Sequence, residues 1–296
     1  MSPAVPGPDP SGLAGLACSV AREAGDLLRT RHGRVQVVET KSSPTDVVTE
    51  MDRAAEELIR RRILAARPGD SILGEEGGLH RAAGSPAGGG AAEPGGGAVR
   101  WIVDPLDGTV NYLYGLPDWA VSIAAEVSGA VVAGAVWVPV RGSLFTATAG
   151  GGAWLQSPDG PDAGPQRLAC NSGVPLAGAL VGTGFGYAAA RRNVQGRVVA
   201  AVLPRVRDIR RGGSAAVDLC SLAAGRLDAF YERGLHDWDF AAGGLIAREA
   251  GARVGGLHGR PPGESMTVAA GPGLFTELHD LLASLDPEHD EDAGPS

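Results

Sequence analysis

One nine-residue run constrains the fold more than any other part of this chain, Trp101-Ile102-Val103-Asp104-Pro105-Leu106-Asp107-Gly108-Thr109. Its first three residues are apolar and favour a buried β-strand. Pro105 cannot donate to a strand ladder and the glycine permits a tight turn, so we expect the strand to end within the run. Asp104 and Asp107 then lie at the rim of a rigid sheet, with the hydroxyl of Thr109 beside them. Oxygen atoms grouped in this way suit a hard cation such as Mg²⁺.

The composition is that of a globular protein and argues against a nucleic-acid partner. The chain has 296 residues, a formal net charge of −8 and a pI of about 5.3. A chain of this length has room for one large domain or two moderate ones around a substantial core. Nucleic-acid binding needs a clustered basic face, which an acidic balance does not favour. The same balance suits the capture of a metal ion.

Cysteine usage and hydropathy predict a cytoplasmic protein with no membrane association. Cys18, Cys170 and Cys220 are far apart and form no C-x-x-C pattern, which indicates a reducing compartment. The proline-rich first eleven residues lack the basic start and apolar stretch of a signal peptide. The longest apolar region, 119–140, is interrupted by Glu126 and is typical of a hairpin rather than a membrane span.

The order of predicted elements is helical, then mostly β, then alternating α/β, which predicts layered sheets and helices of the α/β class. Apolar spacing predicts helices near 13–28, 52–63, 214–224, 239–250 and 275–285. It predicts strands near 35–39, 71–73, 101–103, 119–127, 130–138, 144–147, 179–181, 206–209, 228–231 and 266–270. We expect a disordered tail at 1–11, an α+β half at 12–157, an α/β half at 166–285 and an acidic tail at 286–296. The Gly/Pro/Ala-rich residues 84–97 are interpreted as a surface insertion.

Three further acids lie where predicted elements begin or end. Glu75 follows a short strand and a glycine, and Asp52 and Asp239 lie where helices begin. Taken singly, each could serve the helix dipole, a turn or the solvated surface. If they converge with Asp104 and Asp107, carboxylates about 4 Å apart would repel by roughly 4 kcal/mol per pair at an effective dielectric of 20. Divalent cations resolve such repulsion, and paired metals are a known device for phosphoryl displacement.

These motifs, taken together, resemble the signature set of the inositol monophosphatase family. The similar segments are Thr45-Asp46-Val47-Val48-Thr49-x-x-Asp52, Gly74-Glu75-Glu76, Asp104-Pro105-Leu106-Asp107-Gly108-Thr109, Arg210-Arg211-Gly212-Gly213-Ser214-Ala215-Ala216, Tyr231-Glu232-x-Gly234 and Trp238-Asp239-x-Ala241-Ala242-Gly243. Each is moderately specific, and their order and spacing cover the chain from about 12 to 285. The resemblance implies an αβαβα five-layer sandwich of the inositol monophosphatase and fructose-1,6-bisphosphatase type.

The resemblance also implies a set of metal ligands for two to three Mg²⁺ per active site. Glu75, Asp104 and the backbone carbonyl of Leu106 would hold the first ion. Asp104, Asp107 and Asp239 would hold the second, and Glu75 would support a weaker third through waters. The family usually has Ile where Leu106 stands, which matters little because only the carbonyl is used.

The implied chemistry is the Mg²⁺-dependent hydrolysis of a small phosphate monoester by direct attack of a metal-activated water. Asp52, Thr109 and Glu75 would be catalytic, with Thr109 and Asp52 orienting and deprotonating the water. The implied substrate-binding residues are Asp107, Gly108, Thr109, Gly213, Ser214, Ala215, Glu232 and Asp239. The N–H groups of the helix that opens at 213–215 are expected to face the substrate. We interpret the loop 183–186 and His236 as structural.

The identity of the substrate stays open among several phosphate monoesters. The leading candidate is myo-inositol 1-phosphate, a phosphorylated polyol. The same chemistry on histidinol phosphate, a nucleotide 3′-phosphate or a sugar bisphosphate is the nearest alternative, and Arg191-Arg192 and Arg210-Arg211 keep a bisphosphate possible. An alternative from another class is a non-enzymatic regulatory partner of RNA or of the transcription machinery. The resemblance further implies a homodimer and inhibition by Li⁺.

Overall fold

The computed structural model of the chain describes residues 7–32, 34, 37–40, 47–81, 98–158 and 164–289, with the backbone alone at 37–40 and 47–48. The predicted insertion at 84–97 lies outside the described residues, as do the predicted strand's start at Val35, most of the predicted N-terminal tail and the end of the acidic tail. None of the helices in the described ranges has the length and apolarity needed to cross a bilayer.

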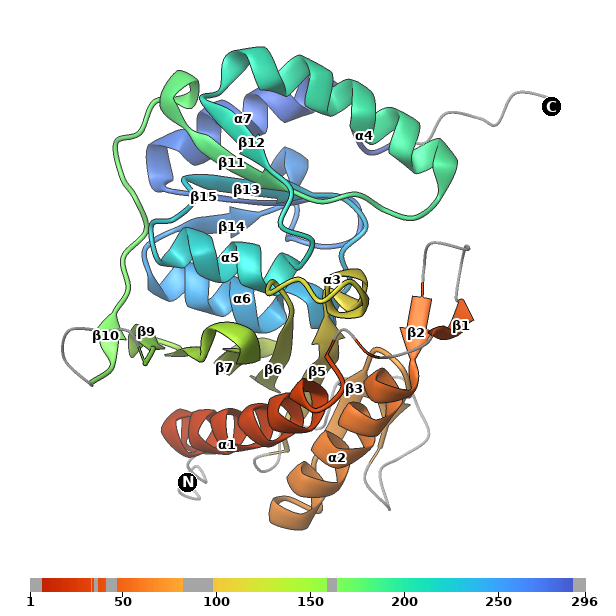
Figure 1. The fold of residues 1–296 in the computed structure, drawn as a ribbon. Coiled ribbons are helices and arrows are strands. Elements are labelled where there is room, and N and C mark those ends of the chain that lie inside the picture. Colours follow the sequence, from red (N-terminus) through yellow and green to blue (C-terminus); the bar gives the residue numbers. More distant parts are fainter. Residues whose placement is uncertain are drawn as a thin grey trace.

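Helices and sheets alternate in five layers, as the resemblance implied (Figure 1). The helices are α1 (Pro10–Arg29), α2 (Glu50–Ala66), α3 (Thr109–Leu113), α4 (Ala189–Val202), α5 (Ala215–Ala223), α6 (Asp237–Glu249) and α7 (Pro272–Ala283). One outer layer is α1 with α2, the middle layer is α5 with α6, and the other outer layer is α4 with α7. The α/β layered fold class is therefore confirmed.

The two large sheets separate these helical layers. The first has eight strands in the order β10-β9-β8-β7-β6-β5-β3-β4. Its members are β3 (Ser71–Gly74), β4 (Gly78–His80), β5 (Arg100–Asp107), β6 (Ala120–Val127), β7 (Ala130–Val138), β8 (Ser143–Thr148), β9 (Gly152–Gln156) and β10 (Gln166–Arg167). The second has five strands in the order β12-β11-β13-β15-β14. Its members are β11 (Leu180–Thr183), β12 (Asp208–Arg210), β13 (Ala229–Glu232), β14 (Arg253–Gly255) and β15 (Thr267–Ala270), and a separate pair joins β1 (Val37–Thr40) to β2 (Val47–Thr49).

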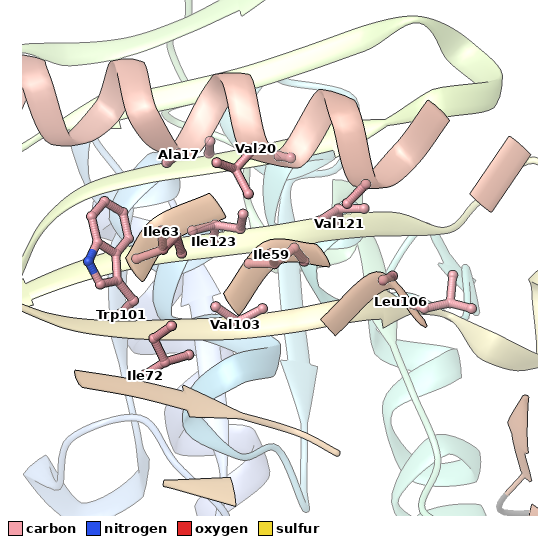
Figure 2. Packing of buried hydrophobic residues seen from close by; sticks show 14 of the residues in the cluster. Ala17, Val20, Ile59, Ile63, Ile72, Trp101, Val103, Leu106, Val121 and Ile123 are labelled. Carbon is pink, nitrogen blue, oxygen red and sulfur yellow. The ribbon is translucent and has the colours of Figure 1, made fainter. Parts of the chain in front are cut away.

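Strand β5 lies between two hydrophobic clusters because its side chains alternate between the faces of the sheet. Trp101 and Val103 pack beneath α1 and α2, whereas Ile102 packs toward α5 and α6. Figure 2 shows Ile59 and Ile63 of α2 against the first of these faces. Complete burial of each such side chain contributes about 1.5–3 kcal/mol. Both faces of β5 are thus covered, so its carboxyl end is held rigidly.

The middle helical layer packs close to the first sheet because small residues face each other across the contact. An added Cβ at Gly134 of β7 would lie 3.1 Å from the Cα of Ala242 on α6. The close approach brings the start of α6 to the edge where β5 ends. Asp239 reaches the ends of the first-sheet strands for this reason.

Strong sequence signals define the first two helices. Asp9 caps α1 by accepting from the N–H groups of Ser11 and Gly12 at 3.1 and 2.9 Å. Helix α1 therefore begins at Pro10, inside the predicted disordered tail 1–11. Thr49 and Asp52 form the predicted capping box of α2, in which each side chain accepts from the backbone N–H of the other residue.

The start of the predicted acidic tail also contacts the folded protein. The guanidinium of Arg233 donates to the carbonyl of Pro287 at 3.2 Å, and Arg260 forms an ion pair with Glu288. Pro287 and Glu288 thus contact Arg233, just after β13, and Arg260, so this part of the predicted acidic tail packs on the folded protein. The described residues also contain α3, α4, β2, β4, β9, β10 and β14, none of which was predicted from the sequence.

Candidate active site

Strands β3 and β5 bring the first two acidic motifs to one edge of the sheet. The strands pair in parallel, with Gly74 opposite Val103. The N–H of Glu75 donates to the carbonyl of Val103 at 3.3 Å. Because the carboxyl ends of parallel neighbours meet at the same edge, Glu75 and Asp104 lie side by side, as their positions after predicted strands indicated.

Strand β5 extends beyond the predicted range 101–103 and does not stop at the proline, although it ends within the run as expected. It continues through Pro105 to Asp107, with a break in register between Asp104, opposite Ser122, and Asp107, opposite Ala120. Three steps on β5 match two on β6, which is the geometry of a β-bulge. A bulge leaves one residue unpaired, so it tolerates a proline and re-aims the neighbouring side chains. The predicted tight turn follows at Gly108, whose φ is 91°.

Several carboxylates converge at this edge, and burial together with their charges raises the pKa of Asp104 and of Asp239. Asp104 is 1% exposed. Its pKa is raised well above the ordinary value by burial first, and then by the charges of Glu75, Asp107 and Asp239. The pKa of Asp239 is raised in the same direction by burial and by Asp107 and Glu75. Four acids from three separate segments therefore share one electrostatic site.

Asp107 joins the two halves of the chain. Its Oδ2 accepts from the hydroxyl of Ser214 at 2.5 Å and from the N–H of Ala216 at 2.7 Å. Burial raises the pKa of Asp107 to about 6, although these hydrogen bonds and the charge of Arg211 act to lower it. The expectation that the N–H groups of α5 face the substrate is thus modified, since the N–H of Ala216 is already bonded to Asp107.

Thr109 and Asp52 form the second part of the site. The Thr109 hydroxyl lies 3.1 Å from Oδ1 of Asp52 and 3.1 Å from the carbonyl of Leu106. The other oxygen of Asp52 accepts from the N–H of Thr49 at 2.8 Å and from its hydroxyl. Burial raises the pKa of Asp52 to about 6, against the lowering effect of the Thr49 hydrogen bonds. The pairing of Thr109 with Asp52 agrees with the expected geometry.

Glu232 stands at the end of β13 in the second sheet, on the side of Asp107. Burial first, and then the charges of Asp107 and Asp218, raise its pKa to about 8. Its carboxylate covers the backbone at Gly184, where any Cβ would collide with it. This packing agrees with a structural role for the loop 183–186.

His236 lies at the N-terminus of α6. Its ring packs against Trp238 with centroids 4.8 Å apart, and its backbone N–H donates to Oδ2 of Asp239 at 2.6 Å. These contacts hold the start of α6 and orient the Asp239 carboxylate.

The role of one buried amide in this region was not predicted from the sequence. The side-chain amide of Asn111 donates to the carbonyls of Asp118 at 2.5 Å and Gly212 at 2.9 Å. It therefore joins the segment after β5 to the loop before α5, which carries Gly213 and Ser214. No local pattern signals this role, because the partner is 101 residues away in the sequence.

The donor chemistry of the site fits a hard divalent cation. Within the described parts of the chain, no three Asp, Glu, His or Cys side chains are already arranged as a ligand set. The fit comes from chemistry: the carboxylates of Glu75, Asp104, Asp107 and Asp239 are all oxygen donors, and burial raises the pKa of each of the last three. Buried anions of this kind are stabilised by a bound cation.

Comparisons with known proteins agree with this geometry. The model of the inositol monophosphatase family matches residues 9–291. Inositol-1-monophosphatase of Mycobacterium leprae is 45% identical over 286 residues, which is 93% of this chain and 94% of that protein. The Nus factor SuhB of Pasteurella multocida is 36% identical over 273 residues, 90% of this chain and 94% of that protein.

A solved structure gives the same result for the fold. Mycobacterium tuberculosis SuhB matches with a TM-score of 0.77 and 42% identity, covering 95% of this chain and 99% of that one. The match of sequence motifs, layer order and overall fold extends over nearly the whole length. The chain belongs to the inositol monophosphatase family and is a phosphoric monoester hydrolase.

Proposed function

We propose that this enzyme hydrolyses myo-inositol 1-phosphate to inositol and phosphate, with Mg²⁺ as its cofactor and water as the direct nucleophile. The observation that carries the proposal is the convergence of four carboxylates beside the Thr109–Asp52 pair. The name of the Mycobacterium leprae relative supports the choice of substrate. We further propose that the protein is cytoplasmic and that it forms a homodimer. Light scattering of the purified protein tests the dimer.

The oxygen donors have distinct roles in this proposal. Glu75, Asp104 and the Leu106 carbonyl would hold one Mg²⁺, and Asp104, Asp107 and Asp239 would hold a second, with a third supported by Glu75. When bound, the ions supply positive charge that neutralises the phosphate oxygens and makes a nearby water more acidic. Asp104 is the residue on which both sets depend.

The chain's own groups then orient the nucleophile and accept its proton. When the Thr109 hydroxyl donates to Oδ1 of Asp52, its oxygen is free to accept a hydrogen bond from a water. The proton leaving that water passes to Thr109 while the Thr109 proton moves to Asp52. A carboxylate with a pKa of about 6 is suited to accept a proton near neutral pH.

Groups from the second half would select the leaving alcohol. Glu232 is an acceptor for polyol hydroxyls, and Ser214, Gly213 and Ala215 line the turn in front of α5. Asp107 touches this turn through its bonds to Ser214 and Ala216. Because the Glu232 carboxyl offers hydrogen-bonding oxygens and no positive charge, an uncharged polyol fits such a set better than a second phosphate.

Turnover of a substrate panel tests this selection. We expect the highest kcat/KM for myo-inositol 1-phosphate and at least a tenfold lower value, about 1.4 kcal/mol in transition-state binding, for histidinol phosphate and a nucleotide 3′-phosphate. Phosphate release is the measurement, with millimolar Li⁺ expected to inhibit it. Equal or faster turnover of histidinol phosphate would overturn the inositol assignment.

The metal-free protein is expected to lose stability as the pH rises through the neutral range. The folded-state pKa values are about 6 for Asp52 and Asp107, about 7 for Asp218 and about 8 for Glu232, all raised mainly by burial. Because these values are raised, the protonated groups stabilise the fold fully below about pH 4, and this contribution is lost as the pH passes each folded-state pKa.

Thermal unfolding in EDTA measures this effect directly. The Tm should fall between about pH 4 and about pH 8, and saturating Mg²⁺ should raise the Tm most at the upper end, where the carboxylates are ionised. A Tm that rises with pH in EDTA would contradict the raised pKa values. A Tm that does not respond to Mg²⁺ at any pH would contradict the metal site.

A further inference from the structure

The carboxylate of Glu56 binds the turn that carries Glu75. Its Oε2 accepts from the N–H of Glu76 at 2.8 Å, and its Oε1 accepts from the N–H of Gly77 at 2.7 Å. Both oxygens of one carboxylate are thus used on two consecutive backbone donors. The turn follows β3 directly, so these bonds fix the backbone immediately after Glu75.

The surrounding backbone is shaped to admit this carboxylate. A Cβ at Gly74 would lie 2.5 Å from Oε2 of Glu56, and a Cβ at Gly77 would lie 2.5 Å from Oε1. Any side chain at either position would therefore displace Glu56. Two glycines that flank the Glu75-Glu76 pair leave room for one acidic side chain from α2.

Helix α2 places Glu56 one turn after Asp52, on the same side of the helix. Asp52 reaches Thr109, while Glu56 reaches the turn at Glu76 and Gly77. Residues four apart on a helix lie one above the other. One rigid helix therefore sets the position of both the Thr109 hydroxyl and the backbone at Glu75.

The two bonds that Glu56 accepts from the turn are charge-assisted, and other carboxylates lie nearby. Glu75 and Glu76 are both close enough to Asp52 to raise its pKa. A further carboxylate on α2 adds to this negative charge. Its two bonds to backbone N–H groups offset the repulsion, since charge-assisted hydrogen bonds are stronger than those to a neutral acceptor.

We propose that Glu56 is a positioning residue for the metal ligand Glu75, acting through the backbone of the turn at Glu76 and Gly77. The inference rests on the proposed function, in which Glu75 binds Mg²⁺. In this proposal Glu56 is a ligand of neither the substrate nor the metal. Its loss should weaken cation binding by loosening Glu75, with a smaller effect on the chemical step at saturating Mg²⁺.

Glu56→Gln and Glu56→Asp test the proposal on the full-length protein. The Gln variant keeps the shape but turns one acceptor into a donor facing an N–H group, and the Asp variant keeps the charge but is too short to reach both donors. Each should weaken Mn²⁺ binding, followed by the electron paramagnetic resonance signal of the free ion, by about tenfold. Hydrogen exchange at the amides of Glu76 and Gly77 should accelerate in both variants.

Glu57→Gln is the matched control, because Glu57 is exposed, pairs with Arg60 and carries the same charge on the same helix. It should change Mn²⁺ affinity by less than about twofold, as expected of a surface charge. Faster amide exchange with unchanged Mn²⁺ affinity would overturn the positioning role, and so would unchanged exchange. Wild-type Mn²⁺ affinity in Glu56→Asp would also overturn it, because the charge alone would then be sufficient. If the wild-type protein itself bound no Mn²⁺ and released no phosphate, the proposed function would fail instead.

Discussion

Replacing Asp104 with Asn is expected to abolish Mg²⁺-dependent phosphate release. In the proposed site this carboxylate is shared by both principal ions, so its loss removes charge from each. Removal of a single preorganised electrostatic group typically costs about 10²–10³-fold in kcat, and a shared ligand should cost at least as much. Phosphate release at saturating Mg²⁺ and substrate is the measurement. Activity that survives this change would overturn the two-metal proposal.

The same variant should be at least as stable as the wild type when no metal is present. Asp104 is buried, and Glu75, Asp107 and Asp239 all raise its pKa. A neutral amide of the same shape removes this repulsion, so the Tm in EDTA should stay constant or rise. Added Mg²⁺ should then stabilise the variant less than the wild type. A constant or raised Tm together with a weaker response to Mg²⁺ would show that the variant keeps its fold and loses the metal site.

Asp280→Asn supplies the control for this experiment. Asp280 lies on α7, and its side chain is 71% exposed beside His279. The same chemical change there should leave phosphate release and the response to Mg²⁺ unaltered. A similar loss in both variants would point to a general effect of charge rather than to the site.

The ends of elements made most of the site predictable from the sequence. Glu75 follows β3, and Asp239 lies in the first turn of α6, so each of these candidate ligands is placed by a local signal of strand or helix. The capping box of Thr49 and Asp52 is likewise a local signal. Because such signals depend on neighbours in the chain, they can be interpreted without knowledge of the fold.

Contacts between distant segments could not be predicted in this way. The bulge in β5 exists only in register with β6, and the Asn111 amide bonds to a carbonyl 101 residues away. Glu56 has the sequence context of a surface helix residue, yet it reaches a turn 20 residues further along. Helix α4 was missed because its buried face is built from Val194, Val198 and Val202, which also favour strands.

Loss of the Thr109 hydroxyl should reduce kcat strongly while cation binding persists. Thr109→Val keeps the shape of the side chain but removes the oxygen that lies 3.1 Å from Asp52. In the proposed mechanism that oxygen holds the water and passes on its proton, a contribution of about 10²–10⁴-fold. Phosphate release gives kcat, and Mn²⁺ binding reports on the site independently.

Thr109→Ser is the control that assigns this loss to the hydroxyl. Serine retains the oxygen and removes only a methyl group, so most of the wild-type kcat should remain. Because Asp52 has a pKa of about 6, the wild-type rate should also fall as the pH drops below that value, when the carboxylate becomes protonated. Thr109→Val should lose this acid limb, since Asp52 then has no hydroxyl through which to accept the proton. A valine variant with near-normal kcat and an unchanged pH profile would remove Thr109 and Asp52 from the proton path.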